Sequence, residues 1–288
     1  MGASPAATPT VTVDPLSTAQ SRRPFWKELF RPGEFEWTLR MRRGDLREFF
    51  APQDPVLMAE RRKWLAEKPE WSLVETPAGA PLVEAAWEMA IGFGHVVPPR
   101  DGGRNLIELA RQWEPDLAFM DFKTKSFAAA CVCLPSSWDP RRWAGKPLDQ
   151  VHGAVPKLQE QIGAQISRFL ERLEPGKGFC RENWGLTLGG ELNFHPELMR
   201  PSLDEGSHLD EVYLRVEHQI FTGLPGGVMM GIRIENCPLT DLAGDPEVWQ
   251  MAIEKIATMP DEVARYKNLL QVREPLAQLM AEFAPASR

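Results

Sequence analysis

The feature that most constrains this chain is a pair of long strand-like runs in its C-terminal third. Residues 211–222 alternate apolar and polar side chains, and residues 228–236 form a second run of strand-forming residues. The five residues between them, 223–227, include three glycines and one proline. Two such runs joined by a short turn predict neighbouring antiparallel strands. A sheet that contains them needs other elements to cover its faces.

Further strands are predicted on both sides of the chain's midpoint. Residues 117–122 and 126–134 are apolar runs around Lys123–Lys125, which indicates a hairpin of buried strands, and residues 181–188 and 35–41 also have strand character. Helical patterns lie before, within and after these strands, at residues 55–68, 81–92, 105–113, 155–173, 245–259, from 260 onward and 276–283. The order predicts an α+β fold, an antiparallel sheet with flanking helices and a helical N-terminal region, and not a parallel nucleotide-binding fold.

The domain organisation follows from length and composition. A chain of 288 residues favours one large domain or one domain with a helical annex. Residues 1–20 are dominated by Ala, Ser, Pro and Thr, which predicts a disordered tail. We therefore expect a single domain over residues 21–288, with helical extensions at both of its ends.

Charge and hydropathy exclude several classes of partner. The net charge of −7 disfavours a general nucleic-acid binder and mildly favours a cationic ligand. The chain has no signal peptide pattern and no apolar run near the ~20 residues that a membrane helix needs. Four scattered cysteines suit a reducing compartment. The sequence predicts a cytoplasmic protein with no nucleic-acid or membrane partner.

The usual cofactor and catalytic motifs are missing from the sequence. No GxGxxG follows a strand, and Walker, GxSxG and HExxH patterns are absent. Binding of a flavin, a nicotinamide or a nucleotide by the usual loops is therefore unsupported. Cys131 and Cys133 share one face of a strand and are interpreted as small buried hydrophobic residues.

One of the five histidines stands out by its surroundings. His152 lies in the stretch 151–156, which we interpret as a bend just before a helix. The positive end of the helix dipole favours a neutral imidazole there, which is the form that binds a metal. His218, on the apolar face of the 211–222 strand, is the main rival as a ligand, although a buried structural histidine is the other interpretation. His195 lies in a turn, and His95 and His208 lie in surface loops.

The strand at residues 211–222 carries an unusual polar face. Arg215, Glu217 and Gln219 lie between two aromatic residues on one side of it. Arg215 with Glu217, and Arg181 with Glu182, could form simple salt bridges within the sheet. Alternatively, these charges bind an acidic group of a cofactor or a charged substrate.

Read together, an ordered set of short motifs resembles a known family. The motifs are Cys133–Trp138, Gly145–Leu148, Val151–Pro156, Arg181–Trp184, Leu214–Gln219, Leu224–Pro225 and Gly231–Ile234. In this order they are similar to the alpha subunits of haem-dependent oxidative N-demethylases, over about residues 25–275. The resemblance implies a PAS-like fold that encloses haem b. It also implies oxidative removal of a methyl group from a small amine such as dimethylamine, using O2 and releasing formaldehyde.

The resemblance also implies partners and site residues. Electrons would come from a separate reductase that carries a flavin and an iron–sulfur cluster, and a folate-binding subunit could receive the formaldehyde. Carried over by position, His152 is the axial iron ligand, with Asp149 as the partner of its second ring nitrogen. Arg181, Asn183 and Gln219 contact the cofactor, with Arg181 and Arg215 near its propionates. Glu217, Trp184 and Arg215 form the catalytic site, in which Glu217 holds the protonated amine and Trp184 closes the pocket.

Two positions depart from the family pattern. Ala154 stands where the family commonly has the first proline of His-x-Pro-Val-Pro, and Gly223 stands where it commonly has an arginine. These departures bear on the substrate and on whether activity is retained. The alternative function is a haem-binding PAS-like oxygen or ligand sensor, or a non-catalytic subunit, because a fold does not determine a function.

Overall fold

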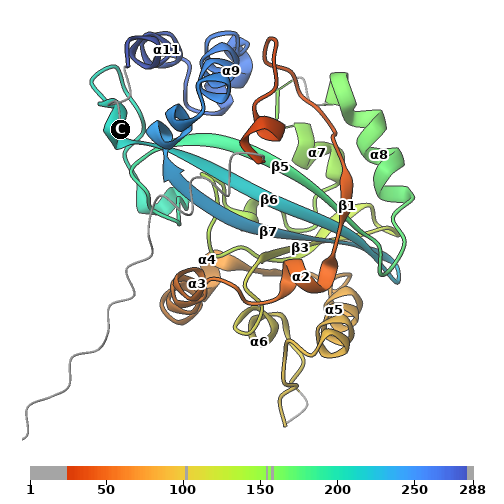
Figure 1. The fold of residues 1–288 in the computed structure, drawn as a ribbon. Helices are drawn as coiled ribbons and strands as arrows, with labels where there is room; N and C mark the ends of the chain where they lie inside the picture. The colour runs from red at the N-terminus through yellow and green to blue at the C-terminus, as the bar shows by residue number, and fades with distance from the viewer. Residues whose placement is uncertain (1–24, 101–102, 154, 157–158, 284–288) are drawn as a thin grey trace, which may run out of the picture.

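The protein is built around one antiparallel sheet. The computed structural model describes residues 25–100, 103–153, 155–156 and 159–283. Within these residues, seven strands form a single sheet, and helices lie on both of its faces (Figure 1). The predicted α+β fold with an antiparallel sheet and flanking helices is thus confirmed. The predicted tail, residues 1–20, lies outside the described residues.

The strand order in the sheet is β1-β5-β6-β7-β3-β4-β2, and every neighbouring pair is antiparallel. The strands are β1 (Arg42–Gly44), β2 (Leu73–Glu75), β3 (Asp116–Asp121), β4 (Ser126–Cys131), β5 (Gly178–Leu188), β6 (Val212–Leu224) and β7 (Gly227–Pro238). The three long strands β5, β6 and β7 are adjacent. They form the part of the sheet on which the polar residues of the sequence analysis lie.

Short and medium helices connect the strands. They are α2 (Leu46–Phe50), α3 (Pro55–Glu67), α4 (Pro69–Ser72), α5 (Ala80–Phe93), α6 (Leu106–Ala110), α7 (Leu148–Gly153), a π-helix (Gln159–Gly163), α8 (Ala164–Glu171), α9 (Pro246–Ala257), α10 (Asp261–Tyr266) and α11 (Arg273–Glu282). Several begin where the sequence supplies a cap. Asp54 and Asp245 each accept hydrogen bonds from the first-turn amides of α3 and α9, with proline in the first turn.

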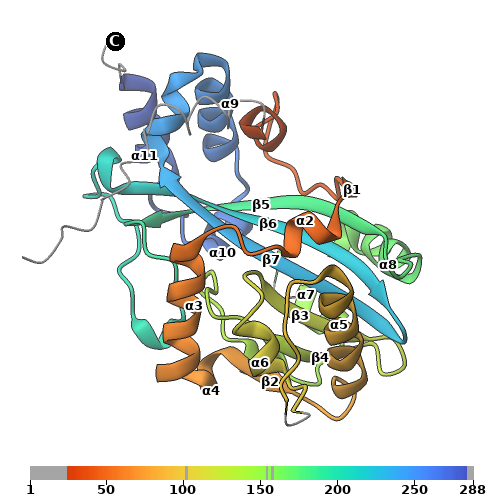
Figure 2. The same cartoon turned by 60° about the horizontal axis from the view of Figure 1, so that its bottom comes forward.

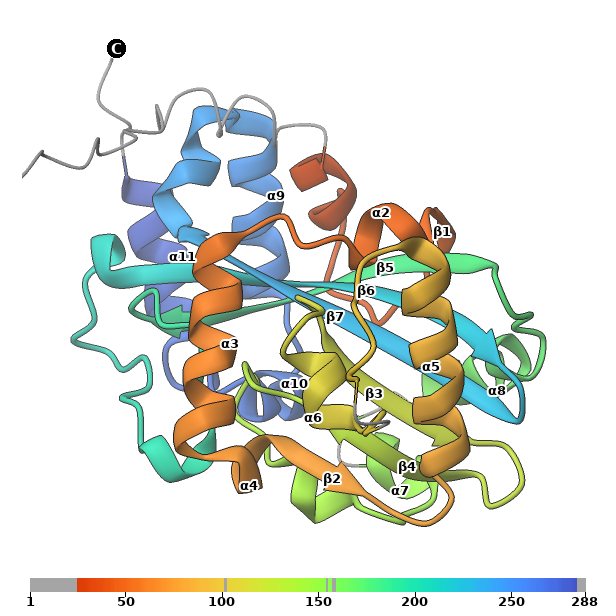
Figure 3. The same ribbon diagram turned by 90° about the horizontal axis from the view of Figure 1, so that it is seen from below.

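The two faces of the sheet are covered by different helices. On β3, Leu117 and Phe119 belong to the apolar core shared with α5 and α6. Ala118 and Met120 alternate with them and face the opposite side, where α7, the π-helix and α8 pack. Figure 3 shows α3, α5 and α6 on the near side of the sheet, with α7 and α10 on the far side. We call the side that faces α7 and α8 the inner face.

The C-terminal helices and the N-terminal segment cover one end of the long strands. α9 and α11 share an apolar core with Leu214 and Val216 of β6 and with Trp26 and Phe30. Polar contacts also join the two ends of the chain: the backbone N–H of Phe35 donates to the Thr258 hydroxyl at 2.9 Å. Figure 2 shows the N-terminal segment beside α9. Residues 28–40 consequently form an outer wall along the sheet's β5 edge.

Most predicted elements are present, and two are wrong in an informative way. The hairpin predicted at residues 117–134 is β3 and β4, and the strands predicted at 211–222 and 228–236 are β6 and β7. Residues 35–41, predicted as a strand, are not one, and β1 begins at Arg42. That segment is held by side chains instead, because the Trp37 indole donates to the Pro156 carbonyl at 2.9 Å.

The second error concerns the stretch around His152. Its backbone lies in α7, whereas the sequence predicted a bend that precedes a helix. The bend comes later, at Val155–Pro156, and the helix predicted over 155–173 is a π-helix followed by α8. Proline at position 156 suits a helix start as well as a turn, so the sequence pattern could not place the boundary.

Candidate functional site

A group of polar side chains lies on the inner face of β5 and β6. Strand alternation places five of the predicted site residues on this face, where Phe179 and Phe221 also meet Phe169 of α8. The five are Arg181, Asn183, Arg215, Glu217 and Gln219. The register brings Asn183 opposite Glu217 and Arg181 opposite Gln219. Five of the seven residues predicted from the sequence are therefore brought together by two adjacent strands.

Glu217 is the centre of this group. Its Oε1 accepts a hydrogen bond from the Ser136 hydroxyl at 2.6 Å. Its Oε2 accepts from the Gln219 amide at 2.9 Å and from the Asn183 amide at 3.2 Å. All three donors are neutral, so they fix the orientation of the carboxylate without neutralising its charge. The site therefore holds an oriented negative charge that can attract a cation.

Arg215 supports this carboxylate indirectly. Its Nε donates to the Ser136 hydroxyl at 2.8 Å, and its Nη2 donates to the Leu134 carbonyl at 2.7 Å. Its Nη1 is buried and has no hydrogen-bond partner among the described residues. Burial lowers the pKa of Arg215 to about 10, although Glu217 opposes the shift. Ser136 thus joins Arg215 to Glu217, and the direct Arg215–Glu217 salt bridge considered from the sequence is replaced by a relay through a hydroxyl.

Two further cations lie near Glu217. Burial lowers the pKa of Arg181, and within the part of the chain that the structure describes its buried Nε has no hydrogen-bond partner. Burial also lowers the pKa of Lys267, which follows α10, to about 8. In both residues Glu217 opposes the shift, which places the three charges within electrostatic range of one another.

Lys267 is positioned by aromatic residues. Its Nζ lies 5.4 Å from the ring centroids of both Trp37 and Trp184 and donates to the Trp184 carbonyl at 2.5 Å. The indole of Trp184 alternates away from Asn183 and packs on Phe30, with ring centroids 5.1 Å apart. The cation that Trp184 contacts in the structure is therefore Lys267. Its predicted role in closing a substrate pocket stays a prediction.

His152, the predicted iron ligand, lies in α7, which packs against the inner face beside β4. Val151, its neighbour in α7, belongs to the apolar cluster of Phe127 and Ala130 of β4. The structure describes the backbone of His152 but not its side chain, and Ala154 lies outside the described residues. Asp149, the predicted partner of the imidazole, is exposed and accepts a hydrogen bond from the Gln150 amide at 2.8 Å.

His218, the rival ligand, points to the opposite face of β6 and is fully engaged there. Its Nε2 lies 3.1 Å from a Glu235 oxygen, its Nδ1 lies 3.9 Å from a Glu182 oxygen, and its ring packs on Phe25. Burial lowers the pKa of His218, but the hydrogen bonds to Glu182 and Glu235 outweigh it and leave the pKa raised. Glu182 itself pairs with Arg42 of β1, so the Arg181–Glu182 pair considered from the sequence does not form.

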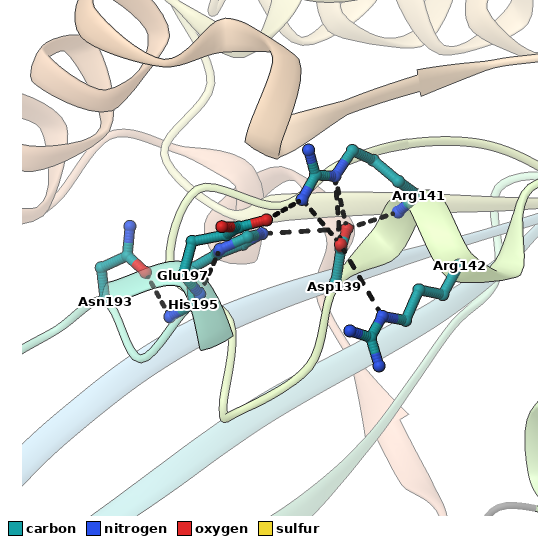
Figure 4. Close-up of polar contacts among 6 residues, drawn as sticks. All are labelled: Asp139, Arg141, Arg142, Asn193, His195 and Glu197. Carbon is teal, nitrogen blue, oxygen red and sulfur yellow. Dashed lines mark hydrogen bonds and ion pairs between the residues drawn. The ribbon is translucent and has the colours of Figure 1, made fainter. Parts of the chain in front are cut away.

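A second polar cluster fixes the loop that carries Ser136. His195 is buried, stacks on Trp71 with centroids 4.8 Å apart, and has its Nε2 3.8 Å from an Asp139 oxygen (Figure 4). Arg141 pairs with both Asp139, at 2.8 Å, and Glu197, at 3.1 Å. Next to His195, the Phe194 amide donates to the Pro135 carbonyl at 3.0 Å. The cluster therefore fastens residues 193–197 to the turn that presents Ser136.

Sequence reasoning missed three residues of the site. Ser136 was part of a recognised motif, but a serine in a Pro-Ser-Ser turn is common and nothing local marks it as a partner of Glu217. Lys267 is one of ten lysines in the chain, and no pattern around it in the sequence marks it as a site residue. Trp37 belonged to the segment that was predicted as a strand. Only the tertiary contacts bring these three residues to β5 and β6.

A family model described as haem-dependent oxidative N-demethylase, alpha subunit-like, matches residues 94–277, which is more than half of the chain. The chain belongs to this family. The membership inferred from the sequence is thereby confirmed, over a shorter span than the 25–275 expected. For this N-demethylase alpha subunit-like chain, the matched span includes β3 to β7 and the whole Glu217 group with Lys267, whereas Trp37 lies outside it.

Two general features of the family member complete the description. No helix among the described residues is both long enough and apolar enough to span a bilayer. The described residues also contain no group of three or more His, Cys, Asp or Glu side chains arranged to hold a bare metal ion. Haem iron differs from a bare ion, since the porphyrin supplies four ligands and the protein needs to supply only an axial one.

Proposed function

We propose that this protein is a haem-dependent oxidative N-demethylase that removes a methyl group from a small methylated amine. O2 is the oxidant, and a separate reductase carrying a flavin and an iron–sulfur cluster supplies the electrons. The observation that carries the proposal is the Glu217 carboxylate, oriented by three neutral donors on the inner face of a sheet that belongs to this family. The family's description supports the haem and the reaction type.

Glu217 is proposed to bind the protonated amine. A buried ammonium group is costly unless a carboxylate pairs with it, and Glu217 has no directly bonded cation among the described residues. Ser136, Asn183 and Gln219 keep the carboxylate in one orientation, so it loses little freedom when the amine arrives. The N-methyl group is then held at a fixed place relative to the inner face.

The inner face fits a haem by its chemistry. Its floor beside α7 is apolar and includes Ala118 and Ala130, which lie directly opposite each other on β3 and β4. The buried Nε of Arg181 and Nη1 of Arg215 have no described partner, and they suit the two acidic groups that a haem carries. His152 of α7 is the proposed axial ligand to the iron of haem b.

The reaction consumes one O2, two electrons and two protons, and it converts an N-methyl amine to the demethylated amine, formaldehyde and water. The haem, when bound, supplies the oxidation of the N–CH3 carbon. The chain's own residues bind and orient the substrate. Glu217 holds the ammonium, while Arg215 acts through Ser136 to hold Glu217. The aromatic side chains around α8 exclude water from the face.

The remaining expectations are proposed on the same basis. Asn183 and Gln219, predicted to contact the cofactor, would lie where the cofactor approaches Glu217. The described chain is proposed to be part of one domain over residues 21–288, with a PAS-like sheet as its haem-binding unit, in a cytoplasmic protein. A folate-binding subunit that receives formaldehyde is a further proposed partner.

Haem binding is tested by absorption spectroscopy of the purified protein with and without added haemin. We expect a Soret band that saturates at one haem per chain. His152→Ala should lose the band or most of the haem content, and His208→Ala, a change of an exposed loop histidine, should leave both unchanged. An unchanged spectrum and haem content in His152→Ala would show that the ligand is another residue.

Catalysis is tested by measuring formaldehyde from the reduced, haem-loaded protein with O2 and a panel of methylated amines. Turnover with at least one amine is expected, and Glu217→Gln should abolish or sharply reduce it. A protein that binds haem and O2 but releases no formaldehyde from any amine would support the sensor alternative and contradict the enzyme.

A further inference from the structure

A cavity of about 100 Å³ lies at the outer edge of β5. Its walls come from the N-terminal segment 28–40, from β5, from α9 and from the end of α10, and they include Trp37, Arg181, Asn183, Trp184, Lys255 and Lys267. β1 pairs with β5 only at Gly178–Cys180, so the edge from Arg181 onward faces this cavity instead of another strand. Its size suits a small ligand.

The cavity contains more buried positive charge than its surroundings compensate. Lys267 donates to a backbone carbonyl, and Arg181 has a buried Nε with no hydrogen-bond partner among the described residues. Glu217 acts electrostatically on both residues. Of the other carboxylates that line the cavity, Glu182 is bound by Arg42, Glu36 pairs with Arg40, and Glu28 is exposed to solvent. Two cations therefore share one carboxylate, and buried charges without a partner are costly.

The cavity is connected to the proposed amine site through Asn183. This side chain lines the cavity and also donates to Glu217 at 3.2 Å. Glu217 itself does not line the cavity, so a ligand whose ammonium group pairs with Glu217 reaches Arg181 and Lys267 only by extending past Asn183. The end of the ligand that reaches them would be stabilised by a negative charge.

We propose that the Arg181–Lys267 cavity is a carboxylate subsite, so that the substrate is an N-methylated amino acid whose ammonium group binds Glu217. This inference rests on the proposed function and names its substrate class. It assigns Arg181 to the carboxylate of the substrate instead of an acidic group of the haem, and it leaves Arg215 for the cofactor. In a zwitterion of this kind the ammonium group compensates Glu217, and the carboxylate compensates Arg181 and Lys267. The reaction is then N-methyl amino acid, O2, two electrons and two protons giving the demethylated amino acid, formaldehyde and water, with the reductase as electron donor.

The test compares two amines that differ only in the proposed feature. N,N-dimethylglycine carries a carboxylate where N,N-dimethylethylamine carries a methyl group. Dissociation constants are measured by titration calorimetry on the haem-loaded protein at pH 7, together with formaldehyde release from each amine. We expect the wild-type protein to bind dimethylglycine about tenfold more tightly or better, as hydrogen bonds to a charged group imply.

Variants of two lysines in the same cavity show which of them causes the preference for dimethylglycine. Lys267→Met fills the same space without the charge, and it should bring the two dissociation constants to within about twofold of each other. Lys255→Met is the matched control, because Lys255 donates to the Glu34 carbonyl and its electrostatic neighbours are Glu36, Glu254 and Arg40. This control should keep the wild-type preference for dimethylglycine.

The possible failures are distinguishable. Formaldehyde from dimethylethylamine with no preference for dimethylglycine contradicts the carboxylate subsite and leaves the proposed function standing. No formaldehyde from any amine contradicts the proposed function. Haem loss in Lys267→Met, with the wild-type amine preference retained, shows that the cavity serves the carboxylates of the cofactor and overturns the inference.

Discussion

Arg61 and Arg215 are both fully buried arginines that belong to one region of the molecule, yet their surroundings are opposite. Asp116 pairs with Arg61 and also accepts the backbone N–H groups of Cys133 and Leu134, at 2.8 and 3.0 Å. Arg215 contacts the same turn, but through the Leu134 carbonyl and the Ser136 hydroxyl, and part of its guanidinium has no described partner.

The Arg61 charge is paired for stability, whereas we propose that the Arg215 charge serves the function. The charge of Arg61 is balanced inside the chain by the Asp116 carboxylate, although its Nε, like the Nη1 of Arg215, has no hydrogen-bond partner among the described residues. Arg215 is held by neutral groups. It donates to the Ser136 hydroxyl, which in turn donates to Glu217, and all hydrogen-bond donors to Glu217 are neutral. A fold can accommodate such incomplete charges at the place where a ligand supplies the missing partner, and they are costly elsewhere.

The largest expected effect comes from breaking the Arg61–Asp116 ion pair. Asp116→Ala leaves the Arg61 guanidinium buried and two backbone N–H groups without acceptors, so the free energy of unfolding should fall by about 3–5 kcal/mol. Urea denaturation followed by circular dichroism measures it. Replacing both partners, as Arg61→Met with Asp116→Leu, should cost less than the single change. An equal or larger loss in the double variant would contradict the view that the unpaired charge is the main cost.

Removing the charge of Glu217 should affect amine binding more than the stability of the fold. Glu217→Gln keeps the shape but loses the ion pair with the ammonium, so amine affinity should fall by roughly 10- to 100-fold. Titration calorimetry measures it. The matched control is Glu235→Gln, on the opposite face of the neighbouring strand, where the carboxylate pairs with His218. If the control weakens amine binding as much, Glu217 has no special role.

Breaking the link that Ser136 makes between Arg215 and Glu217 should have a smaller effect on amine affinity. Ser136→Ala removes one acceptor from Arg215 and one donor to Glu217, and each is a hydrogen bond to a charged group. The free energy of unfolding should fall by about 1.5–3 kcal/mol. Amine affinity should fall less than in Glu217→Gln. Ser136→Thr, which restores the hydroxyl, should recover most of the amine affinity, and a failure to do so would assign the loss to packing.

The smallest expected effect is a pH dependence of carboxylate recognition. The pKa of Lys267 is lowered to about 8 by burial, with Glu217 and Arg181 as the charged groups that face it. Below this pKa the Lys267 side chain is protonated and attracts the carboxylate of the ligand. Above it the side chain is neutral and the attraction is lost. The preference for dimethylglycine over dimethylethylamine should therefore drop by roughly fourfold between pH 7 and pH 8.5. Lys267→Met should show no such drop, and the same drop in this variant would assign the titration to another group.

How far the sequence could predict this site depends on the length scale of each contact. Alternation along one strand placed Arg215, Glu217 and Gln219 on a common face, because that periodicity is local. The hydrogen bond between Ser136 and Glu217 joins residues 81 apart, and the contact of Lys267 with Trp184 joins residues 83 apart. No local pattern contains those contacts.

The fold shows the same limit. The hairpin of β3 and β4 and the pair β6 and β7 were predicted because their turns and runs are continuous in sequence. The strand expected at residues 35–41 was wrong, since its alternating pattern reflects side chains that pack along the β5 edge without strand pairing. Likewise His152 was placed in a bend, and only the packing of α7 on the inner face shows that its backbone is helical.

The wall formed by residues 28–40 has a consequence for how this architecture can diversify. Glu217 and Lys267 lie in the span that the family model matches, whereas the segment 28–40, which carries Trp37, precedes that span. Lys267 and the segment 28–40 thus come from separate parts of the chain and meet at a small cavity. Exchanging residues 28–40 for another sequence would change the shape of this cavity and leave Glu217 and its three donors unchanged in sequence. Ligand selectivity could therefore be altered from a segment outside the span that the family shares.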